Sequence, residues 1–307
     1  MARAALRCGL AGTGYWARIT HAPVLASTAA LKFTAVWGQS ADATSALAAS
    51  HDVTAHSDFD AFLADVDAVA FSVPPDVQSA LAIRAAGAGK HLLLEKPIAT
   101  SEHAAQALAE SVAAAGVASV VFFTARFQPE VRAWLAGIAG QSGWLGGHAA
   151  WFGTSMLESS PFNTPWRQEK GGLWDLGPHV VSLLSASLGP VRSVTADAGQ
   201  PDMTHLVLHH ESGATSTATM TQAASEAAAA FDLYVWGEPG RSFSPVETVE
   251  PQAALRVALT ELAENASSGQ TAHPCDVRFG LDVVRLLADA QRQIDALPSA
   301  AADRAAR

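Results

Sequence analysis

Cysteine is scarce in this sequence: its 307 residues include only Cys8 and Cys275. The two lie near opposite ends of the chain and form no recognisable metal-binding or redox spacing, and nothing supports a disulfide between them. A disulfide scaffold and a cysteine-based metal site are therefore excluded. Both residues are predicted to be buried thiols.

Long hydrophobic runs and basic clusters are also missing. Hydrophobic residues make up 49% of the chain, yet no uninterrupted apolar run approaches the ~18 to 20 residues that a membrane span needs. The segment Met1 to Leu6 runs straight into an apolar stretch and leaves no room for a signal peptide. The net charge of -10, without any Lys/Arg cluster, argues against a nucleic-acid partner. We therefore expect a globular cytoplasmic protein with no membrane or nucleic-acid partner.

A glycine-rich corner follows the first apolar run of the chain. Residues 6–10 are typical of a buried strand, and Gly12, Gly14 and Ala17 come next with G-x-G-x-x-A spacing. The bare backbone N–H groups of such a corner can approach a pyrophosphate, and a small third residue lets helix and strand pack closely. By itself, the motif fits an ordinary strand-to-helix corner equally well.

Strands and helices alternate around this corner. Strands are predicted at 31–37, 66–73, 91–94 and 117–124, with helices at 18–27, 41–50, 78–88 and 101–115. This alternation predicts a parallel sheet with right-handed connections. A chain of 307 residues is long enough for two domains, and we predict the first over residues 1–122.

The end of the second predicted strand bears on the choice of cofactor. An NAD-preferring site places an Asp or Glu there, where it binds the ribose 2′-hydroxyl and repels a 2′-phosphate. Here Gly38-Gln39-Ser40 follows the strand, and the nearest acid, Asp42, lies further on. Ser40 can donate to a phosphate, although no Arg or Lys is present to pair with it. The choice between NAD and NADP stays open, with NADP slightly favoured.

Charged residues follow the strand predicted at 91–94. Glu95-Lys96-Pro97 comes directly after it, so Lys96 is expected at the carboxyl edge of the sheet, where open α/β folds bind ligands. The alternative is a surface Glu-Lys pair before a helix-starting proline.

The pattern changes from Trp144 onward to strands with longer connections. Strands are predicted at 148–152, 191–198, 203–210, 214–221 and 231–236, and helices at 253–264 and 276–296. These segments predict a largely antiparallel sheet in a second domain over residues 123–307.

A segment rich in charge and glycine lies between the first two of these strands. A helix is predicted from about Pro178 to Leu188, with Asp175 near its N-cap. Asp175 and His179 are four residues apart and can lie on one face. The sequence offers no third ligand at suitable spacing, so we expect no metal.

Together these segments resemble the Gfo/Idh/MocA family, the glucose-fructose oxidoreductase and inositol dehydrogenase type. The resemblance covers essentially the whole chain and rests on four motifs: Gly12-Thr13-Gly14-Tyr15-Trp16-Ala17; Gly89-Lys90-His91 leading into Glu95-Lys96-Pro97; Arg126-Phe127; and Gly171-Gly172-Leu173-Trp174-Asp175-Leu176-Gly177-Pro178-His179. It implies an α/β protein with an N-terminal Rossmann-like parallel sheet and a C-terminal α+β domain with an open, largely antiparallel sheet. That sheet often forms an oligomer interface, which implies a homodimer or homotetramer.

The resemblance also implies an NAD(P)-dependent oxidoreductase that transfers a hydride between the nicotinamide and a hydroxyl or carbonyl carbon of a sugar, polyol or related cyclic alcohol. The implied catalytic set is Lys96, Asp175 and His179. Oxidation requires the hydroxyl proton to leave, and an imidazole, with its unperturbed pKa of about 6.5, suits that task. Asp175 would orient the ring or bind a substrate hydroxyl, and Lys96 would stabilise the alkoxide or share the proton. Without the resemblance, His179 is a core or capping histidine and Asp175 a plain N-cap.

The implied cofactor-binding residues fall into four groups along the chain: Gly12, Thr13, Gly14, Tyr15 and Trp16 at the corner; Ser40 after the second strand; Val73 and Pro74 after the third; and Glu95, Lys96, Trp166 and Arg167 at the nicotinamide end. Two positions depart from the family pattern, because Gln78 stands where a His is common and Ser182 where an acid is common. The alternative function is a non-catalytic dinucleotide-binding sensor of the same fold. The presence of all three implied catalytic residues favours the enzyme.

Overall fold

The computed structural model describes residues 5–245 and 250–297. The chain forms two compact units: unit 1 comprises Met1–Arg132 and Thr248–Val284, and unit 2 comprises Ala133–Glu247 and Arg285–Arg307. The predicted boundary after residue 122 separates a dinucleotide-binding from a substrate-binding domain, and this division stays a prediction. The packing adds that the described residues 250–284 belong with the first unit.

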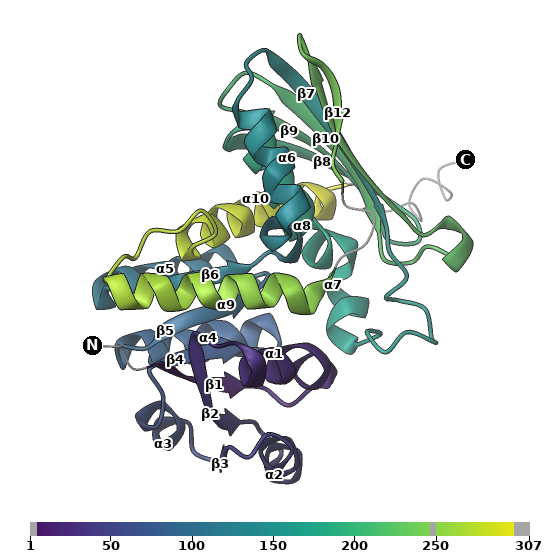
Figure 1. The fold of residues 1–307 in the computed structure, drawn as a ribbon. Helices are drawn as coiled ribbons and strands as arrows, with labels where there is room; N and C mark the ends of the chain where they lie inside the picture. The colour runs from purple at the N-terminus through teal and green to yellow at the C-terminus, as the bar shows by residue number, and fades with distance from the viewer. Residues whose placement is uncertain (1–4, 246–249, 298–307) are drawn as a thin grey trace. The chain divides into compact units, whose positions relative to one another are not determined.

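Unit 1 is built on a six-stranded sheet (Figure 1). Its strands are β1 (Leu6–Ala11), β2 (Leu31–Trp37), β3 (Thr54–His56), β4 (Ala68–Phe71), β5 (His91–Glu95) and β6 (Ser119–Phe122). Their order is β3-β2-β1-β4-β5-β6, and every neighbouring pair is parallel. The predicted Rossmann-like parallel sheet is confirmed, and the short edge strand β3 is an addition. In this order ligands bind beyond the carboxyl ends of β1 and β4, where the strand order reverses.

Helices connect these strands and cover both faces of the sheet. They are the π-turn η1 (Ala17–His21), α1 (Ala22–Ser27), α2 (Ala41–Ala49), α3 (Phe59–Ala64), α4 (Pro75–Gly87), α5 (Glu102–Ala115), the 3-10 turn η2 (Thr124–Phe127) and α9 (Pro251–Ser268). Ser40, Asp58 and Ser101 begin α2, α3 and α5, because each side chain accepts a hydrogen bond from the backbone N–H three residues later. Helices α1 and α9 pack together on one face, and α4 and α5 on the other (Figure 1). Strand β4 is consequently buried along its whole length.

Unit 2 is built on a second six-stranded sheet. Its strands are β7 (Trp144–Phe152), β8 (Val191–Gly199), β9 (Met203–His210), β10 (Thr215–Thr221), β11 (Ala230–Gly237) and β12 (Gly240–Phe243), in the order β12-β11-β7-β10-β9-β8. Every neighbouring pair is antiparallel except β7 and β10, which are parallel. The predicted, largely antiparallel sheet is therefore confirmed, with one parallel pair in its middle.

The helices of unit 2 are α6 (Pro129–Ala139), which begins in unit 1, α7 (Pro165–Asp175) and α8 (Gly177–Leu188). Helix α8 packs against β7 and β10. The last helix, α10 (Val277–Asp295), belongs to both units: Gly280 packs against Ile98 in unit 1, and Leu287 packs beside Gly177 in unit 2. The sequence pattern did not predict α6, α7 or β12.

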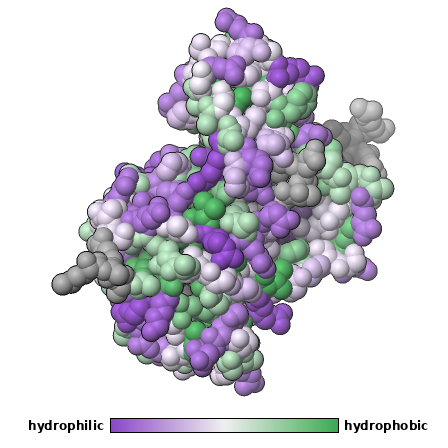
Figure 2. Space-filling view, viewed as in Figure 1, coloured by the Kyte–Doolittle hydropathy of each residue, from purple (hydrophilic) through white to green (hydrophobic). Residues whose placement is uncertain are grey.

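The surface carries both hydrophobic and hydrophilic residues. On the face drawn in Figure 2, hydrophobic residues lie in patches among hydrophilic ones. Within residues 5–245 and 250–297, no helix combines the length and hydrophobicity required to cross a bilayer.

Candidate functional site

The glycine corner at the end of β1 is built by two glycines with opposite surroundings. Gly12 has φ +130°, and a Cβ there would lie 2.2 Å from the carbonyl oxygen of Ser72, just after β4. Its N–H donates to Trp37 O at 2.8 Å, which ties the corner to β2 as well. A Cβ at Gly14, in contrast, would meet no atom within 4 Å. The corner is therefore tight where the strands meet and open where the helix begins, as a bound pyrophosphate requires.

Other predicted cofactor residues surround this corner. Val73 lies beside Gly12, with its Cγ1 3.2 Å from the position of a Cβ there, and Pro74 is the N-cap of α4. Thr13 packs closely on Gly38, at the end of β2, where a Cβ would lie 2.7 Å from its methyl group. Ser40 begins α2, and its hydroxyl oxygen accepts a hydrogen bond from Ala43 N at 3.3 Å. Because a hydroxyl both accepts and donates, this cap leaves the Ser40 proton available to a ligand.

Glu95, at the end of β5, is held at both its backbone and its carboxylate. Its Oε1 accepts a hydrogen bond from Trp16 Nε1 at 2.8 Å. The same oxygen is hydrogen-bonded to His21 Nε2, also at 2.8 Å. Gln78 holds the backbone, with Nε2 donating to Glu95 O and Oε1 accepting from Glu95 N, both at 2.8 Å. Lys96 follows directly and is joined to Pro97 by a cis peptide bond. Trp16 and Glu95 were both predicted in the site, and the structure brings them together.

Sequence reasoning missed His21 and did not assign Gln78 a role. Both side chains are fully buried. The only signal for Gln78 was its departure from the family pattern, and no sequence signal pointed to His21.

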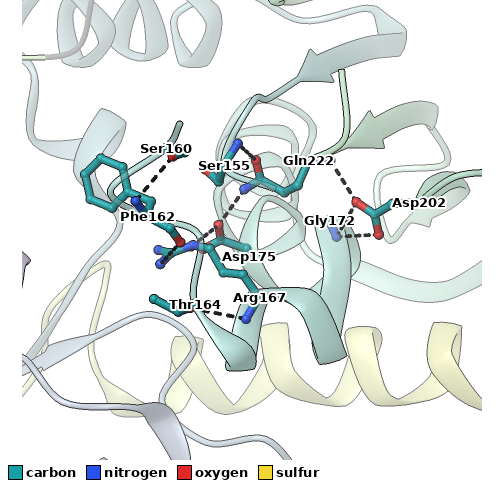
Figure 3. Close-up of polar contacts among 9 residues, drawn as sticks. All are labelled: Ser155, Ser160, Phe162, Thr164, Arg167, Gly172, Asp175, Asp202 and Gln222. Carbon is teal, nitrogen blue, oxygen red and sulfur yellow. Dashed lines mark hydrogen bonds and ion pairs between the residues drawn. The ribbon is translucent and has the colours of Figure 1, made fainter. Parts of the chain in front are cut away.

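In unit 2, Asp175 forms the centre of a buried polar network (Figure 3). Arg167 Nε donates to Asp175 Oδ2 at 2.7 Å, and Gln222 Nε2 donates to the same oxygen at 2.5 Å. Arg167 also donates to Phe162 O at 3.2 Å, and Thr164 caps α7 by accepting from Arg167 N. A guanidinium and an amide thus hold a carboxylate that is only 4% exposed, which satisfies the charge in the interior.

A second, half-buried carboxylate, Asp202, supports this network through the backbone. Both its oxygens accept from Gly172 N at 3.0 Å, and Oδ2 also accepts from Gln222 N at 2.7 Å (Figure 3). The pKa of Asp202 is raised, mainly because the carboxyl is partly buried and to a smaller extent because the Asp175 charge is near. The two backbone N–H groups lower the pKa and offset part of this rise. The chain breaks helical geometry at Gly171, with φ 67° and ψ -169°, where a Cβ would lie 2.3 Å from Asp202 Oδ1. Asp202 and Gln222 carried no signal in the sequence.

The implied base, His179, lies in the first turn of α8 and is 9% exposed. Its ring packs on Trp151 of β7, with centroids 5.4 Å apart. Asp175, expected near the N-cap of this helix, lies one residue before the N-cap Leu176, whose apolar side chain forms no cap bond. It is the last residue of α7, and its carboxylate binds Arg167. In α7, the buried Nε1 of Trp166 has no hydrogen-bond partner among the described residues.

The predicted site residues thus form separate groups within the two units. Unit 1 holds the glycine corner with Val73 and, separately, the Trp16–Glu95 pair followed by Lys96. Unit 2 holds the Arg167–Asp175 pair, Trp166 and His179. In the described parts of the chain, no group of three His, Cys, Asp or Glu side chains is arranged to hold a metal ion.

Known proteins show similarity to the chain at both sequence and fold level. It is 28% identical over 205 residues to the uncharacterized oxidoreductase YdgJ of Escherichia coli strain K12, covering 64% of this chain and 57% of that one. It is 30% identical over 140 residues to a levoglucosan dehydrogenase of Pseudarthrobacter phenanthrenivorans, covering 43% of this chain and 35% of that one. The chain therefore spans only about a third to somewhat over half of the length of these curated relatives. The solved structure of GenD2 from gentamicin A biosynthesis, in complex with NAD, has the same fold, with a TM-score of 0.82 at 19% identity and 96% of each chain covered.

Two family models match consecutive parts of the chain. Residues 6–123, which include β1 to β6, match an oxidoreductase family with an NAD-binding Rossmann fold. Residues 130–242, which include β7 to β11, match the C-terminal domain of the same family. The chain therefore belongs to the Gfo/Idh/MocA family of NAD-binding oxidoreductases.

Proposed function

We propose that the protein is an NAD(P)-dependent oxidoreductase that transfers a hydride between the nicotinamide and a hydroxyl or carbonyl carbon of a sugar or polyol. The observation that carries the proposal is the corner at Gly12 and Gly14. It lies at the end of β1, beside the reversal of strand order, and is closed at Gly12 and open at Gly14. A dinucleotide needs this combination, because only a backbone without a side chain lets the pyrophosphate approach.

Within unit 1, the corner from Gly12 to Trp16 would bind the pyrophosphate, with Val73 and Pro74 beside it. Ser40 would face the adenosine ribose, and Glu95 and Lys96 the nicotinamide end. Trp166, whose buried indole N–H has no described partner, and Arg167 would serve the same end from unit 2. The Ser40 hydroxyl and the lack of an acid at Gly38-Gln39 favour NADP, while the family description and the NAD-bound GenD2 structure favour NAD.

When bound, the nicotinamide supplies the hydride acceptor or donor of the reaction. In the proposed mechanism, His179 takes the proton of the substrate hydroxyl during oxidation and returns it during reduction. The side chain of Asp175, held by Arg167 and Gln222, fixes the orientation of the substrate or of the imidazole and does not move the proton. Lys96 stabilises the negative charge that develops on the substrate oxygen.

The sugar or polyol class is supported by the relative named levoglucosan dehydrogenase, which acts on an anhydrosugar by its name. The test is to follow the absorbance of reduced nicotinamide with both cofactors and a panel of sugars, anhydrosugars and inositols. We expect turnover with at least one member. It should fall ~10²- to 10⁴-fold in His179→Ala, the range for loss of acid–base catalysis, and ~10²- to 10³-fold in Lys96→Met, the range for loss of charge stabilisation. Dinucleotide binding without turnover across the panel would favour the sensor. Unchanged turnover in both variants would refute the assigned roles.

Binding at the corner has its own test with a matched pair of variants. A methyl group at Gly14 would enter the open space beside the backbone, so Gly14→Ala is expected to weaken NADH and NADPH binding while the fold is kept. A Cβ at Gly87, in the last turn of α4, also meets no atom within 4 Å, and Gly87→Ala should leave binding unchanged. Equal affinity in the two variants would contradict the proposed pyrophosphate position.

Cofactor preference can be tested at Ser40. Ser40→Asp keeps a residue that caps helices well but introduces a charge that repels a 2′-phosphate. If NADP is preferred, this variant should bind NADPH more weakly and NADH at least as well. A wild-type protein that binds only NADH would overturn the preference for NADP.

We further propose that the protein forms a homodimer or homotetramer through the open face of the unit 2 sheet. Along β11, Leu233 and Val235 point inward, whereas Trp236, 44% exposed, lies on the outward face, with Phe243 of β12, 59% exposed, on the same side. Apolar side chains that form a contiguous exposed patch are typical of association surfaces. Light scattering after gel filtration should give the molar mass of a dimer or a larger oligomer. In Trp236→Asp this mass should shift toward that of a monomer. A monomeric wild type at all concentrations would refute this.

A further inference from the structure

His21 is a fully buried histidine whose only described polar contact is with the predicted cofactor residue Glu95. The side chain is 0% exposed, and its Nε2 lies 2.8 Å from Glu95 Oε1, the same atom that accepts from Trp16. Its other ring nitrogen, Nδ1, is buried and has no partner among the described residues. Phe122 lies edge-on to the ring at a centroid distance of 6.4 Å. A buried polar atom without a partner destabilises the fold, so its presence calls for an explanation.

The backbone explains how Trp16 and His21 reach one oxygen atom. The two residues are five positions apart, and in an α-helix of 3.6 residues per turn they would point about 140° apart. The chain here forms the π-turn η1, in which Ala22 N–H bonds to Ala17 O, five residues back. The wider i→i+5 turn brings residues five apart much closer to one side of the helix than an α-helix would, so both rings can reach Glu95. Such turns are frequent at functional sites.

Glu95 is consequently fixed along its whole length. Gln78 binds both polar groups of its backbone, and the two rings bind its carboxylate through Oε1. Because a carboxylate only accepts hydrogen bonds, the proton of the His21 ring lies on Nε2. Within the described residues both donors use Oε1, and the Glu95 side chain keeps 14% exposure. A ligand hydrogen bond would then go to the second oxygen, Oε2.

We propose that His21 is a positioning residue that holds Glu95 ready to accept a hydrogen bond from a hydroxyl or amide at the nicotinamide end of the dinucleotide. The inference rests on the proposed function, because it assumes that the dinucleotide binds at this edge of unit 1. His21 itself does not touch the cofactor. Its contribution is to order the Glu95 side chain before the dinucleotide binds, so that binding costs less conformational entropy.

The test measures NADH and NADPH dissociation constants by fluorescence in the full chain. His21→Phe keeps a ring but removes the donor, and we expect affinity to fall by about 3- to 10-fold, the cost of immobilising one side chain on binding. His21→Gln can place an amide N–H near the position of Nε2, and should restore affinity to within about 1.5-fold of wild type. A purely structural role for the ring does not predict this rescue.

A matched control is available in unit 2. His210 is equally buried, but its nitrogens bond to Gly189 O and Ser216 Oγ, far along the chain from the corner. His210→Phe should lower the unfolding temperature without changing dinucleotide affinity. If His21→Phe does not fold, His21→Asn replaces it in the test, because the shorter asparagine side chain cannot reach Glu95. The Asn variant should then bind the dinucleotide as weakly as is expected of the Phe variant.

The outcomes separate this inference from the proposed function. If wild type binds and turns over a dinucleotide but folded His21→Phe, or His21→Asn in its place, binds equally well, the positioning role is wrong and the proposed function stands. If the Gln variant binds as weakly as the Phe variant, the donor is not what matters, and the role is again wrong. If wild type binds neither NADH nor NADPH, both the function and this inference fail.

Discussion

The tight packing around Gly171 predicts a large loss of stability when it is replaced by alanine. Its backbone, at φ 67° and ψ -169°, occupies a region that residues with a Cβ rarely adopt. The added methyl would also lie 2.3 Å from Asp202 Oδ1. Since that carboxylate accepts from the N–H groups of Gly172 and Gln222, the clash cannot be relieved without disturbing these bonds.

The expected magnitude is the sum of these two effects. A strained backbone conformation costs about 1 to 3 kcal/mol, and a weakened hydrogen bond to the half-buried Asp202 charge adds about 1.5 to 3 kcal/mol. The total of roughly 2.5 to 6 kcal/mol is a large share of the ~5 to 15 kcal/mol by which proteins are stable. For a unit of this size, it corresponds to a drop in unfolding temperature on the order of 10 °C or more.

Thermal unfolding followed by circular dichroism measures this effect directly. Gly137→Ala is the matched control, because Gly137 lies inside α6 and a Cβ there would meet no atom within 4 Å. That variant should be as stable as wild type or more stable by about 0.4 to 1 kcal/mol. If Gly171→Ala unfolds within about 2 °C of wild type, the argument from its backbone and from Asp202 is wrong.

Three further predictions concern unit 1. Burial by itself would raise the pKa of Glu261, but hydrogen bonds from Arg132 and His273 lower it from 4.5 to about 2. This pairing therefore stabilises the fold above pH 4.5, and the stabilisation, about 1 to 2 kcal/mol after allowance for solvent screening, is lost as the pH falls toward 2. In urea unfolding, the free energy of unfolding should fall less between pH 7 and pH 3 in Glu261→Gln than in wild type. An equal fall in the two proteins would contradict the pairing. Burial raises the pKa of the Cys8 thiol to about 12, so a thiol reagent at pH 8 should label Cys8 only after unfolding, and rapid labelling of the native protein would refute its burial. Gly12→Ala should be poorly folded, because its Cβ would lie 2.2 Å from a backbone carbonyl, and a variant with native stability would rule out the tight corner.

Much of the fold follows from local patterns in the chain. The strand predicted at 31–37 coincides with β2, and the glycine spacing after β1 correctly marks the corner. These features depend on neighbouring residues: a buried strand needs a short apolar run, and a helix start needs a capping side chain such as Ser101. Helix α7 could not be found in this way, because Gly171-Gly172 has low helical propensity and is held by contacts made elsewhere.

The supporting residues of the candidate site have no local signature. Asp202 is 30 positions from Gly172, and Gln222 is 47 from Asp175, so no spacing rule connects them. For the same reason, the sequence placed Asp175 near the start of α8 but gave no sign that a guanidinium and an amide bind its carboxylate.

The sequence by itself determined the parallel and antiparallel sheets, the glycine corner and the family, because these depend on periodicity and on motifs read along the chain. Only the tertiary structure decided which side chains hold the predicted ones in place, with His21 on Glu95 and Gln222 on Asp175. The physical reason is that a buried charge needs donors from whichever segments surround it after folding, and their distance along the chain does not matter.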